Sequence, residues 1–206
     1  MEQQPTKVRA SEGSFGVLDA GTVQGDPADY SNGLIIAMLA GARIHTGINM
    51  GPVRVTATAL RQRPSPVEDI DGWDEVVEAS VYAPRGQLRI ESLEEGPVPG
   101  LPLLSPAGPG WYRLLVRARG RDGAYDAAVD RPTEDYVITA WPEQPSPARL
   151  LRTNDECGRS LRRSAPQQPA AHRAPSTPDT AETDRQAALR SRLLRAGMPP
   201  QPPSDE

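Results

Sequence analysis

Hydrophobic and polar residues alternate along most of the first two thirds of the chain, with the two-residue period of a half-buried β-strand. Segment 52–61 shows the pattern best, because apolar residues from Val53 to Ala59 occupy every second position. Successive side chains of a strand point to opposite faces, so this spacing predicts one buried face. The same alternation returns in 75–82, 87–92, 111–119 and 134–141. In the first three of these, the expected inward residues are Val77, Ala79, Val81, Leu88, Ile90, Tyr112, Leu114, Val116 and Ala118. Segment 134–141 has Tyr136, Ile138 and Ala140 on one face and Val137, Thr139 and Trp141 on the other.

Three shorter segments complete a predicted set of about eight strands. Residues 14–19 and 42–46 have brief alternation, and 33–39 is a continuous apolar run that indicates a strand covered on both faces. Ala40 and Gly41 predict a hairpin between 33–39 and 42–46. The fold class predicted is all-β, a two-layer antiparallel β-sandwich over residues 13–143. A barrel would give nearly the same pattern, so the strand order stays open.

The two ends of the chain differ from this body. Residues 1–12 are polar and predicted to be disordered. Residues 144–206 are predicted to form a disordered, Pro/Arg-rich tail, since 11 of the 23 prolines follow Ala140. One helix is predicted within the tail at 178–196, where Thr177 and Pro178 provide a start signal and Gly197 a stop. It is either a transient helix or one that docks into a partner's groove.

Composition narrows the classes of function. Residues 1–150 carry 14 basic and 20 acidic groups and residues 151–206 carry 9 and 7, so the body has a charge of −6 and the tail +2. An acidic body argues against nucleic-acid binding, which depends on neutralising phosphates. The longest apolar run, 34–40, is too short to span a membrane, and no signal peptide is evident, so we expect a cytoplasmic protein.

The densest polar feature is an acidic segment in which six carboxylates fall within positions 68–78. One interpretation is a docking patch for a basic partner, formed by Asp69, Asp71, Trp73, Asp74 and Glu75, with the indole as an aromatic anchor. The alternative is a solvated loop in which the indole packs inwards. A calcium loop is a third interpretation, but the segment has only two of the aspartates at the required spacing.

Catalytic residues are not evident, and we expect no metal, no cofactor and, on balance, no enzyme. The two histidines are His45, predicted to be an ordinary sheet residue, and His172 in the tail; Cys157 is predicted to be an exposed thiol. An alternative pocket would need His45, Tyr112, Arg113 and Trp141 to converge. Arg113, Arg117, Arg119 and Arg121 predict a cationic stripe that pairs with carboxylates across strands.

Several short motifs carry a resemblance to known proteins. Residues 108–114 (GPGWYRL), 116–122 (VRARGRD), Glu134-Asp135-Tyr136 and Trp141-Pro142 resemble a set of uncharacterised bacterial, largely actinobacterial, proteins, which implies no activity. The wider layout over residues 14–142 resembles competence protein J, a cytoplasmic inhibitor of a DNA-entry nuclease. That likeness implies a β-rich inhibitor but transfers no inhibitory residue by position.

These observations lead to a hypothesis of a non-enzymatic protein-binding module, such as an inhibitor or immunity-type protein. Its partner would be a basic protein such as a nuclease or toxin, engaged through the acidic loop. One alternative is a small-ligand-binding or hydrolytic β-sandwich with a pocket near His45. Another is a structural adaptor that acts through its tail helix.

Overall fold

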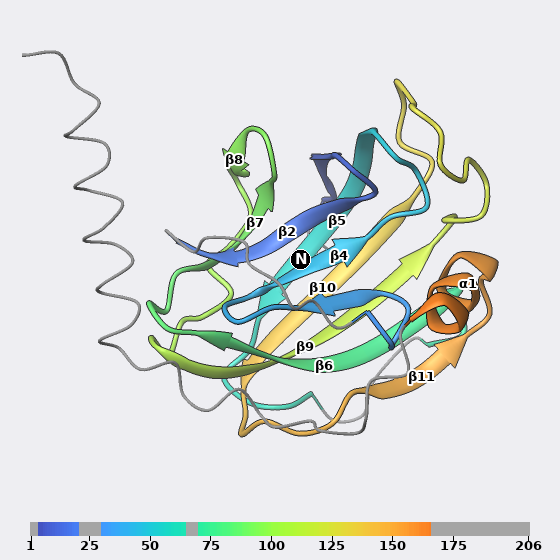
Figure 1. Cartoon of the computed structure of the whole chain (residues 1–206). Coiled ribbons are helices and arrows are strands. Elements are labelled where there is room, and N and C mark those ends of the chain that lie inside the picture. The colour runs from blue at the N-terminus through green and yellow to red at the C-terminus, as the bar shows by residue number, and fades with distance from the viewer. Residues whose placement is uncertain (1–3, 21–29, 65–69, 166–206) are drawn as a thin grey trace, which may run out of the picture. The chain divides into compact units, whose positions relative to one another are not determined.

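Eleven strands and one helix form in the part of the chain that the computed structural model describes, residues 4–20, 30–64 and 70–165 (Figure 1). The six-stranded sheet has the order β1 (Thr6–Ala10), β5 (Gly51–Ala59), β10 (Asp135–Pro142), β9 (Gly110–Arg119), β6 (Glu75–Ala83) and β11 (Arg149–Thr153). The five-stranded sheet has the order β3 (Ile35–Ala37), β4 (Ala42–His45), β2 (Ser14–Asp19), β7 (Leu88–Ser92) and β8 (Gly96–Pro97). Helix α1 (Glu156–Ser164) follows β11.

The two sheets pack against each other as the two layers of a sandwich, which confirms the predicted fold class. The main apolar cluster takes inward residues from both sheets, and the Phe15 ring of β2 meets the Tyr136 ring of β10 edge to face, with centroids 5.2 Å apart. Every residue expected to point inwards in β5, β6, β7 and β9 contributes to or packs against this cluster, and β10 contributes its Tyr136, Ile138 and Ala140 face. Burial of each large aliphatic side chain contributes about 1.5–3 kcal/mol.

One strand pair departs from the antiparallel prediction. Strand β10 pairs with β5 in parallel register, with Tyr136 opposite Val55 and Ile138 opposite Ala57, while β10 and β9 are antiparallel. Parallel neighbours need a long connection rather than a tight turn. Here the chain leaves β5, builds β6 to β9, and returns through β10 between β5 and β9. The six-stranded sheet is therefore mixed.

The outer face of the six-stranded sheet is also covered, which alternation alone did not predict. A second apolar cluster there contains Trp73, Val76, Leu115 and Trp141, with Leu151 of β11 packed against it. Because of this cover, charged side chains expected at the surface lie in the interior; Arg113 is fully buried and donates to Glu78 at 3.5 Å. The expected cross-strand pairing is present in this case.

The described body extends beyond both predicted limits. Residues 6–10, predicted to be disordered, form β1, because Val8 and Ala10 reach the core and the strand pairs with β5. Residues 149–164, predicted to lie in the disordered tail, form β11 and α1. The 33–39 strand is shorter than predicted and lies at a sheet edge, although its hairpin with 42–45 is confirmed. The 178–196 helix lies outside the described residues.

Helix α1 has clear local start and end signals. The Asp155 side chain caps it by accepting from Gly158 N at 2.8 Å, Glu156 lies in the first turn, and Arg162 and Arg163 lie in the last turn. Each charge complements the helix dipole at its end. Within the described ranges, this nine-residue helix is too short and too polar to cross a bilayer.

Candidate functional site

A polar pocket of about 380 Å³ opens at one end of the sandwich, where three connections meet. The first is the turn between β1 and β2, the second is the segment that leaves β4 and crosses to β5, and the third is the β9–β10 loop. The lining residues are Glu12, Gly13, His45, Thr46, Gly47, Ile48, Asn49, Tyr125 and Asp126. The volume lies at the lower end of the range for small-molecule sites.

The pocket contains unusual backbone conformations. Glu12 has φ 51° and Asp126 has φ 56°, and among the described residues these two are the non-glycine residues with positive φ. A left-handed conformation costs a non-glycine residue roughly 1–3 kcal/mol and persists where the surroundings enforce it, often at functional sites. Asp126 N donates to Gly47 O at 2.8 Å, and Asn49 Nδ2 donates to the Asp126 carboxylate at 3.0 Å.

The His45 ring forms one wall of the pocket, and it has a different neighbour at each nitrogen. A side-chain carbon placed on Gly13 would lie 3.9 Å from Nε2, so this nitrogen faces the β1–β2 turn. Nδ1 lies 3.9 Å from Cys157 Sγ on the protein side. Burial, followed by the charge of Arg121, lowers the pKa of His45 to about 4. The imidazole is therefore neutral at pH 7, with one donor and one acceptor nitrogen.

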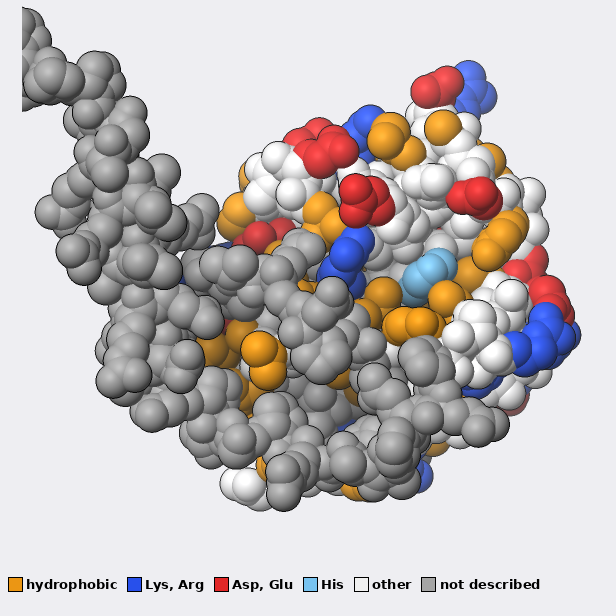
Figure 2. Space-filling view, viewed as in Figure 1, with side chains coloured by type: hydrophobic (Ala, Val, Ile, Leu, Met, Phe, Trp, Pro, Cys, Tyr) orange, Lys and Arg blue, Asp and Glu red, His pale blue; other side chains and the backbone are white. Residues whose placement is uncertain are grey.

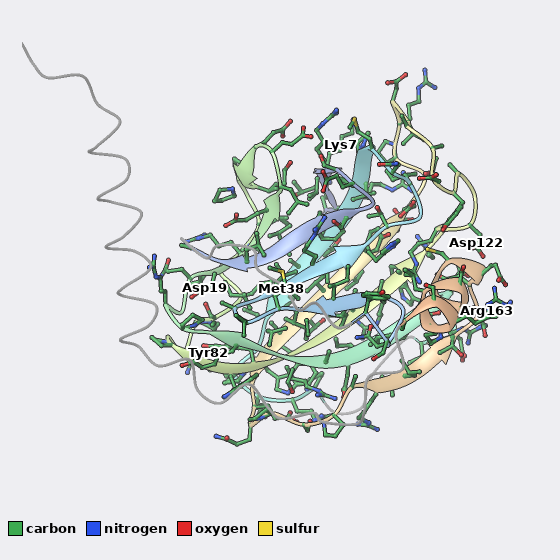
Figure 3. All side chains as sticks on the ribbon, viewed as in Figure 1. Lys7, Asp19, Met38, Tyr82, Asp122 and Arg163 are labelled. Carbon is green, nitrogen blue, oxygen red and sulfur yellow. The ribbon has the colours of Figure 1, made fainter. Side chains whose placement is uncertain are left out.

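Cys157 lies directly behind His45, in the first turn of α1. Its backbone N–H donates to Asp122 Oδ1 at 2.9 Å, and Figure 3 labels Asp122 beside the helix. The side chain is 2% exposed, which corrects the prediction of an exposed thiol. Burial raises the pKa of Cys157 to about 11, and nearby Asp155 adds to the effect. The thiol is protonated at neutral pH, whereas the nucleophile in cysteine catalysis is the thiolate.

A buried arginine connects the pocket wall to α1. Arg121 is fully buried and makes a bidentate pair with Asp155, with Nε to Oδ2 at 2.6 Å and Nη2 to Oδ1 at 2.8 Å. Its Nη1 donates to Gly33 O at 3.1 Å and to His45 O at 3.3 Å. Gly47 is required beside it, since a Cβ there would lie 1.8 Å from Arg121 O.

Glu134 fixes the pocket floor from the other side. Its carboxylate accepts from Ile48 N at 2.6 Å and Gly47 N at 3.2 Å, and the Tyr136 hydroxyl donates to it as well. Burial raises the pKa of Glu134, and these three hydrogen bonds oppose that effect. The segment after His45 is therefore held by two side chains of the β9–β10 loop, Arg121 and Glu134, so the pocket is preorganised.

The open side of the pocket is acidic and partly aromatic. Its charged lining residues are the carboxylates Glu12 and Asp126, and none of the residues that line it is lysine or arginine. Outside the lining, Arg43 forms an ion pair with Glu12, with its Nη2 3.8 Å from Glu12 Oε2. Tyr125 is 59% exposed, and Met50, which forms a β-bridge with Ala128 of the β9–β10 loop, is also exposed. In Figure 2 the pale-blue histidine side chain lies at this face, with carboxylate and hydrophobic groups around it. It belongs to His45, because His172 lies outside the described residues.

The predicted acidic patch is divided between the surface and the interior. Asp71 and Asp74 are exposed, and they contact Arg152 at 3.1 Å and Gly120 N at 2.9 Å. Trp73 is 9% exposed and packs inwards, as the solvated-loop interpretation had it, with the Arg119 guanidinium 4.9 Å from its ring centroid. Glu75 is buried and pairs with Arg162. Asp69 lies outside the described residues.

The alternative pocket predicted from sequence does not form from its four residues. Tyr112 lies between the sheets and its hydroxyl donates to Gly108 O at 2.8 Å. Arg113 and Trp141 are register partners, both fully buried on the opposite face of the six-stranded sheet. Neighbouring positions of a strand point to opposite faces, so Tyr112 and Arg113 cannot meet. Of these four residues, only His45 lines the pocket described above.

Fold and site together define a two-sheet β-sandwich protein with a preorganised acidic pocket. No protein-family model matches the sequence, and no curated protein matches it. Among solved structures, the chain is similar to one titled "Crocagin biosynthetic gene J", with 19% identity and a TM-score of 0.38 over 68% of this chain and 97% of that chain. This TM-score is too low to indicate a shared fold or a shared function. These comparisons give no support to the resemblance to competence protein J.

Within the described ranges, no group of three or more His, Cys, Asp and Glu side chains is arranged to hold a metal ion. The pocket residues that sequence reasoning missed are turn residues, whose side chains come together only through loop geometry. Two weak signals were available: the Glu12-Gly13 pair before a strand, and Asp126 in a turn-rich segment.

Proposed function

We propose that this protein is a non-enzymatic binding module that holds a cationic group of a basic peptide or protein partner in the His45 pocket. The observation that carries the proposal is that a preorganised pocket places Glu12 and Asp126, both with left-handed backbone, around one opening. The partner is a basic protein, as in the sequence-based hypothesis, but the binding surface is the His45 pocket instead of the acidic loop. A nuclease or toxin with a basic surface belongs to this class of partner.

The pocket offers complementary contacts to an arginine or lysine side chain. Two carboxylates attract the charge, and charge-assisted hydrogen bonds to them are the stronger kind. The exposed Tyr125 ring can stack on a guanidinium or ammonium, which contributes about 0.5–1 kcal/mol at an exposed site. Neutral His45 adds a hydrogen-bonding nitrogen without repelling the cation.

The protonation states at the site favour binding over nucleophilic catalysis. A cysteine–histidine catalytic pair works as thiolate and imidazolium, whereas here burial keeps both groups neutral near pH 7. Cys157 is also covered by protein, so a substrate in the pocket would meet the imidazole first. These observations favour recognition over a hydrolytic role.

The test uses small probes of defined charge: N-acetyl-L-arginine amide, N-acetyl-L-lysine amide and, as a neutral control, N-acetyl-L-glutamine amide. Amide shifts of Gly13 and Gly47 in ¹H–¹⁵N spectra should move on titration with the two cations and not with the neutral probe. The double variant Glu12→Gln/Asp126→Asn should weaken binding about tenfold, which corresponds to about 1.4 kcal/mol.

A matched variant distinguishes this pocket from the acidic loop. Asp71→Asn/Asp74→Asn removes the same number of carboxylates from the other surface and should leave probe affinity unchanged. If the loop variant weakens binding and the pocket variant does not, the acidic loop is the binding surface and the pocket proposal is wrong. Equal shifts with the neutral probe would also contradict it.

A further inference from the structure

Two buried carboxyl groups meet where α1 packs against the start of β6. Glu75 is the first residue of β6 and Asp155 is the N-cap of α1, and their exposures are 0% and 2%. A Cβ placed on Gly158 would lie 2.8 Å from Asp155 Oδ1 and 3.0 Å from Glu75 Cδ. The two carboxyls therefore converge over the same helix backbone atom, with no room for a side chain between them.

The hydrogen bonds around this pair leave one oxygen without a donor. Both Asp155 oxygens accept from Arg121, and Oδ1 also accepts from Gly158 N. One Glu75 oxygen accepts from Arg162 in the last turn of α1, but Oε2 has no hydrogen-bond partner. A buried acceptor without a donor is costly. A proton on Glu75 removes that cost, because the O–H can then donate to Asp155.

The charges that face Glu75 come from each element packed against it. Arg162 and Asp155 belong to α1 and its cap, and Arg121 comes from the loop after β9. Burial is the main reason that the pKa of Glu75 rises to about 7; the Arg162 hydrogen bond opposes the rise and the Asp155 charge adds to it. Burial acts in the same direction on Asp155, but Arg121 outweighs it and lowers the pKa.

Helix α1 is also the backing of the His45 pocket. Cys157 Sγ lies against His45 Nδ1, and Arg121 bridges Asp155 to His45 O. Glu134, which lies near Arg121, accepts from Ile48 N and so holds the segment after His45 from the opposite side. A change in how α1 docks therefore reaches the pocket wall through two direct contacts.

We propose that the proton shared by Glu75 and Asp155 is a latch that holds α1 in place and thereby regulates the His45 pocket. Loss of this proton leaves two buried carboxylates side by side, loosens α1 and weakens binding in the pocket. The second half of this inference rests on the proposed binding function, whereas the first half does not.

The single cysteine of the chain reports α1 docking directly. Cys157 becomes accessible to N-ethylmaleimide only when α1 opens, and Glu75→Gln mimics the protonated state because its amide can donate to Asp155. Dividing the wild-type alkylation rate by the Glu75→Gln rate at each pH cancels the intrinsic pH dependence of the thiol. The ratio should rise by roughly one to two orders of magnitude from pH 5 to pH 8, most of it below pH 7. A ratio that stays flat overturns the latch.

Two further measurements provide a control and an independent check for this test. Asp71→Asn, which removes an exposed carboxyl paired with Arg152, should follow the wild-type profile. Residue-assigned carbon-13 titration of the wild-type carboxyls should give Glu75 a midpoint near pH 7, and the assignment separates it from Glu134, whose pKa burial also raises. If Glu75 titrates near its ordinary value, the latch is wrong whether or not Glu75→Gln folds.

The regulatory half is tested by binding of N-acetyl-L-arginine amide at pH 5.5 and pH 8. Relative to Glu75→Gln, the wild type should lose about threefold or more in affinity at pH 8 and nothing at pH 5.5. A rising alkylation ratio with equal affinities at pH 8 overturns the regulatory link and leaves the binding function intact. Absence of binding by either protein at both pH values overturns the binding function, while the alkylation ratio still decides the latch.

Discussion

Removing the positive charge of Arg121 should destabilise the protein strongly. The Arg121→Met variant leaves the Asp155 carboxylate buried, without the partner that now donates at 2.6 and 2.8 Å. Breaking a buried pair on one side costs about 3–5 kcal/mol, a large share of the 5–15 kcal/mol of a typical domain. At about 2–4 °C per kcal/mol for a chain of this size, the melting temperature should fall by about 10 °C.

A double-mutant cycle separates the ion pair from the other contacts of Arg121. Asp155→Asn keeps a capping oxygen for Gly158 N, and it should cost about 3 kcal/mol or less because Glu75 can ionise and serve as the counterion. Both Arg121→Met variants lose the hydrogen bonds to Gly33 O and His45 O, so those contributions cancel in the cycle. The coupling energy should be about 2–3 kcal/mol.

Urea denaturation followed by tryptophan fluorescence measures all four corners of the cycle. The exposed pair Asp71–Arg152 provides the surface comparison, and Asp71→Asn should change stability by less than about 1 kcal/mol. If the double variant is as unstable as the sum of the single variants, Arg121 and Asp155 do not interact energetically, and the account of the network behind the pocket fails.

Three further outcomes are expected. Glu75 has a pKa of about 7 in the folded chain against an ordinary 4.5, so its stabilising proton is fully bound below pH 4.5 and lost as pH rises to 7. Over that window the wild type should lose up to about 3 kcal/mol relative to Glu75→Gln in urea melts, and a constant difference would contradict this. Glu12→Gly relieves the left-handed strain and should stabilise by about 1 kcal/mol while lowering probe affinity; a loss of stability would show that φ 51° is not strained. Phe15→Ala should cost about 3–5 kcal/mol and Phe15→Leu much less, since both remove the ring that meets Tyr136 but leucine refills most of its volume whereas alanine leaves a cavity; calorimetry giving equal costs would contradict this.

The strand faces could be predicted from the sequence because a shared interior imposes a two-residue period. Val53 to Ala59 and Tyr112 to Ala118 are the clearest cases, and each alternate residue packs as expected. The orientation of β10 beside β5 could not be predicted, because alternation gives the face of a strand but neither its neighbour nor its direction. The strand predicted over 33–39 is only Ile35–Ala37 in the structure. A continuous apolar run has no alternation, so it indicates neither the ends of a strand nor its pairing register.

The ends of the body were missed for a different reason. Strand β1 contributes only Val8 and Ala10 to the core, too few positions to show a period. Helix α1 did have signals, with Asp155 as a cap and basic residues in its last turn, but the surrounding proline-rich composition outweighed them. Local capping residues were more informative here than average composition.

The pocket depends on contacts between residues that are far apart in the chain. His45 and Cys157 are 112 positions apart, and Arg121 reaches Gly33 across 88. Sequence reasoning treats each as an isolated histidine, cysteine or arginine, for which an ordinary structural role is the better prediction. They meet because helix α1 and the β9–β10 loop both contact the end of β4.

The position of the buried charges supports a role in shaping the pocket. A buried ion pair contributes little net stability compared with well-packed apolar residues, so replacing Arg121 and Asp155 together should cost far less than removing Arg121 alone. The apolar cluster between the sheets already provides that stability. The charged groups instead hold one backbone segment, because Arg121 donates to His45 O while Glu134 accepts from Gly47 N and Ile48 N. Since that segment forms the floor and wall of the pocket, replacing Arg121 together with its buried partner Asp155 by apolar residues of similar volume should preserve the fold and weaken probe binding.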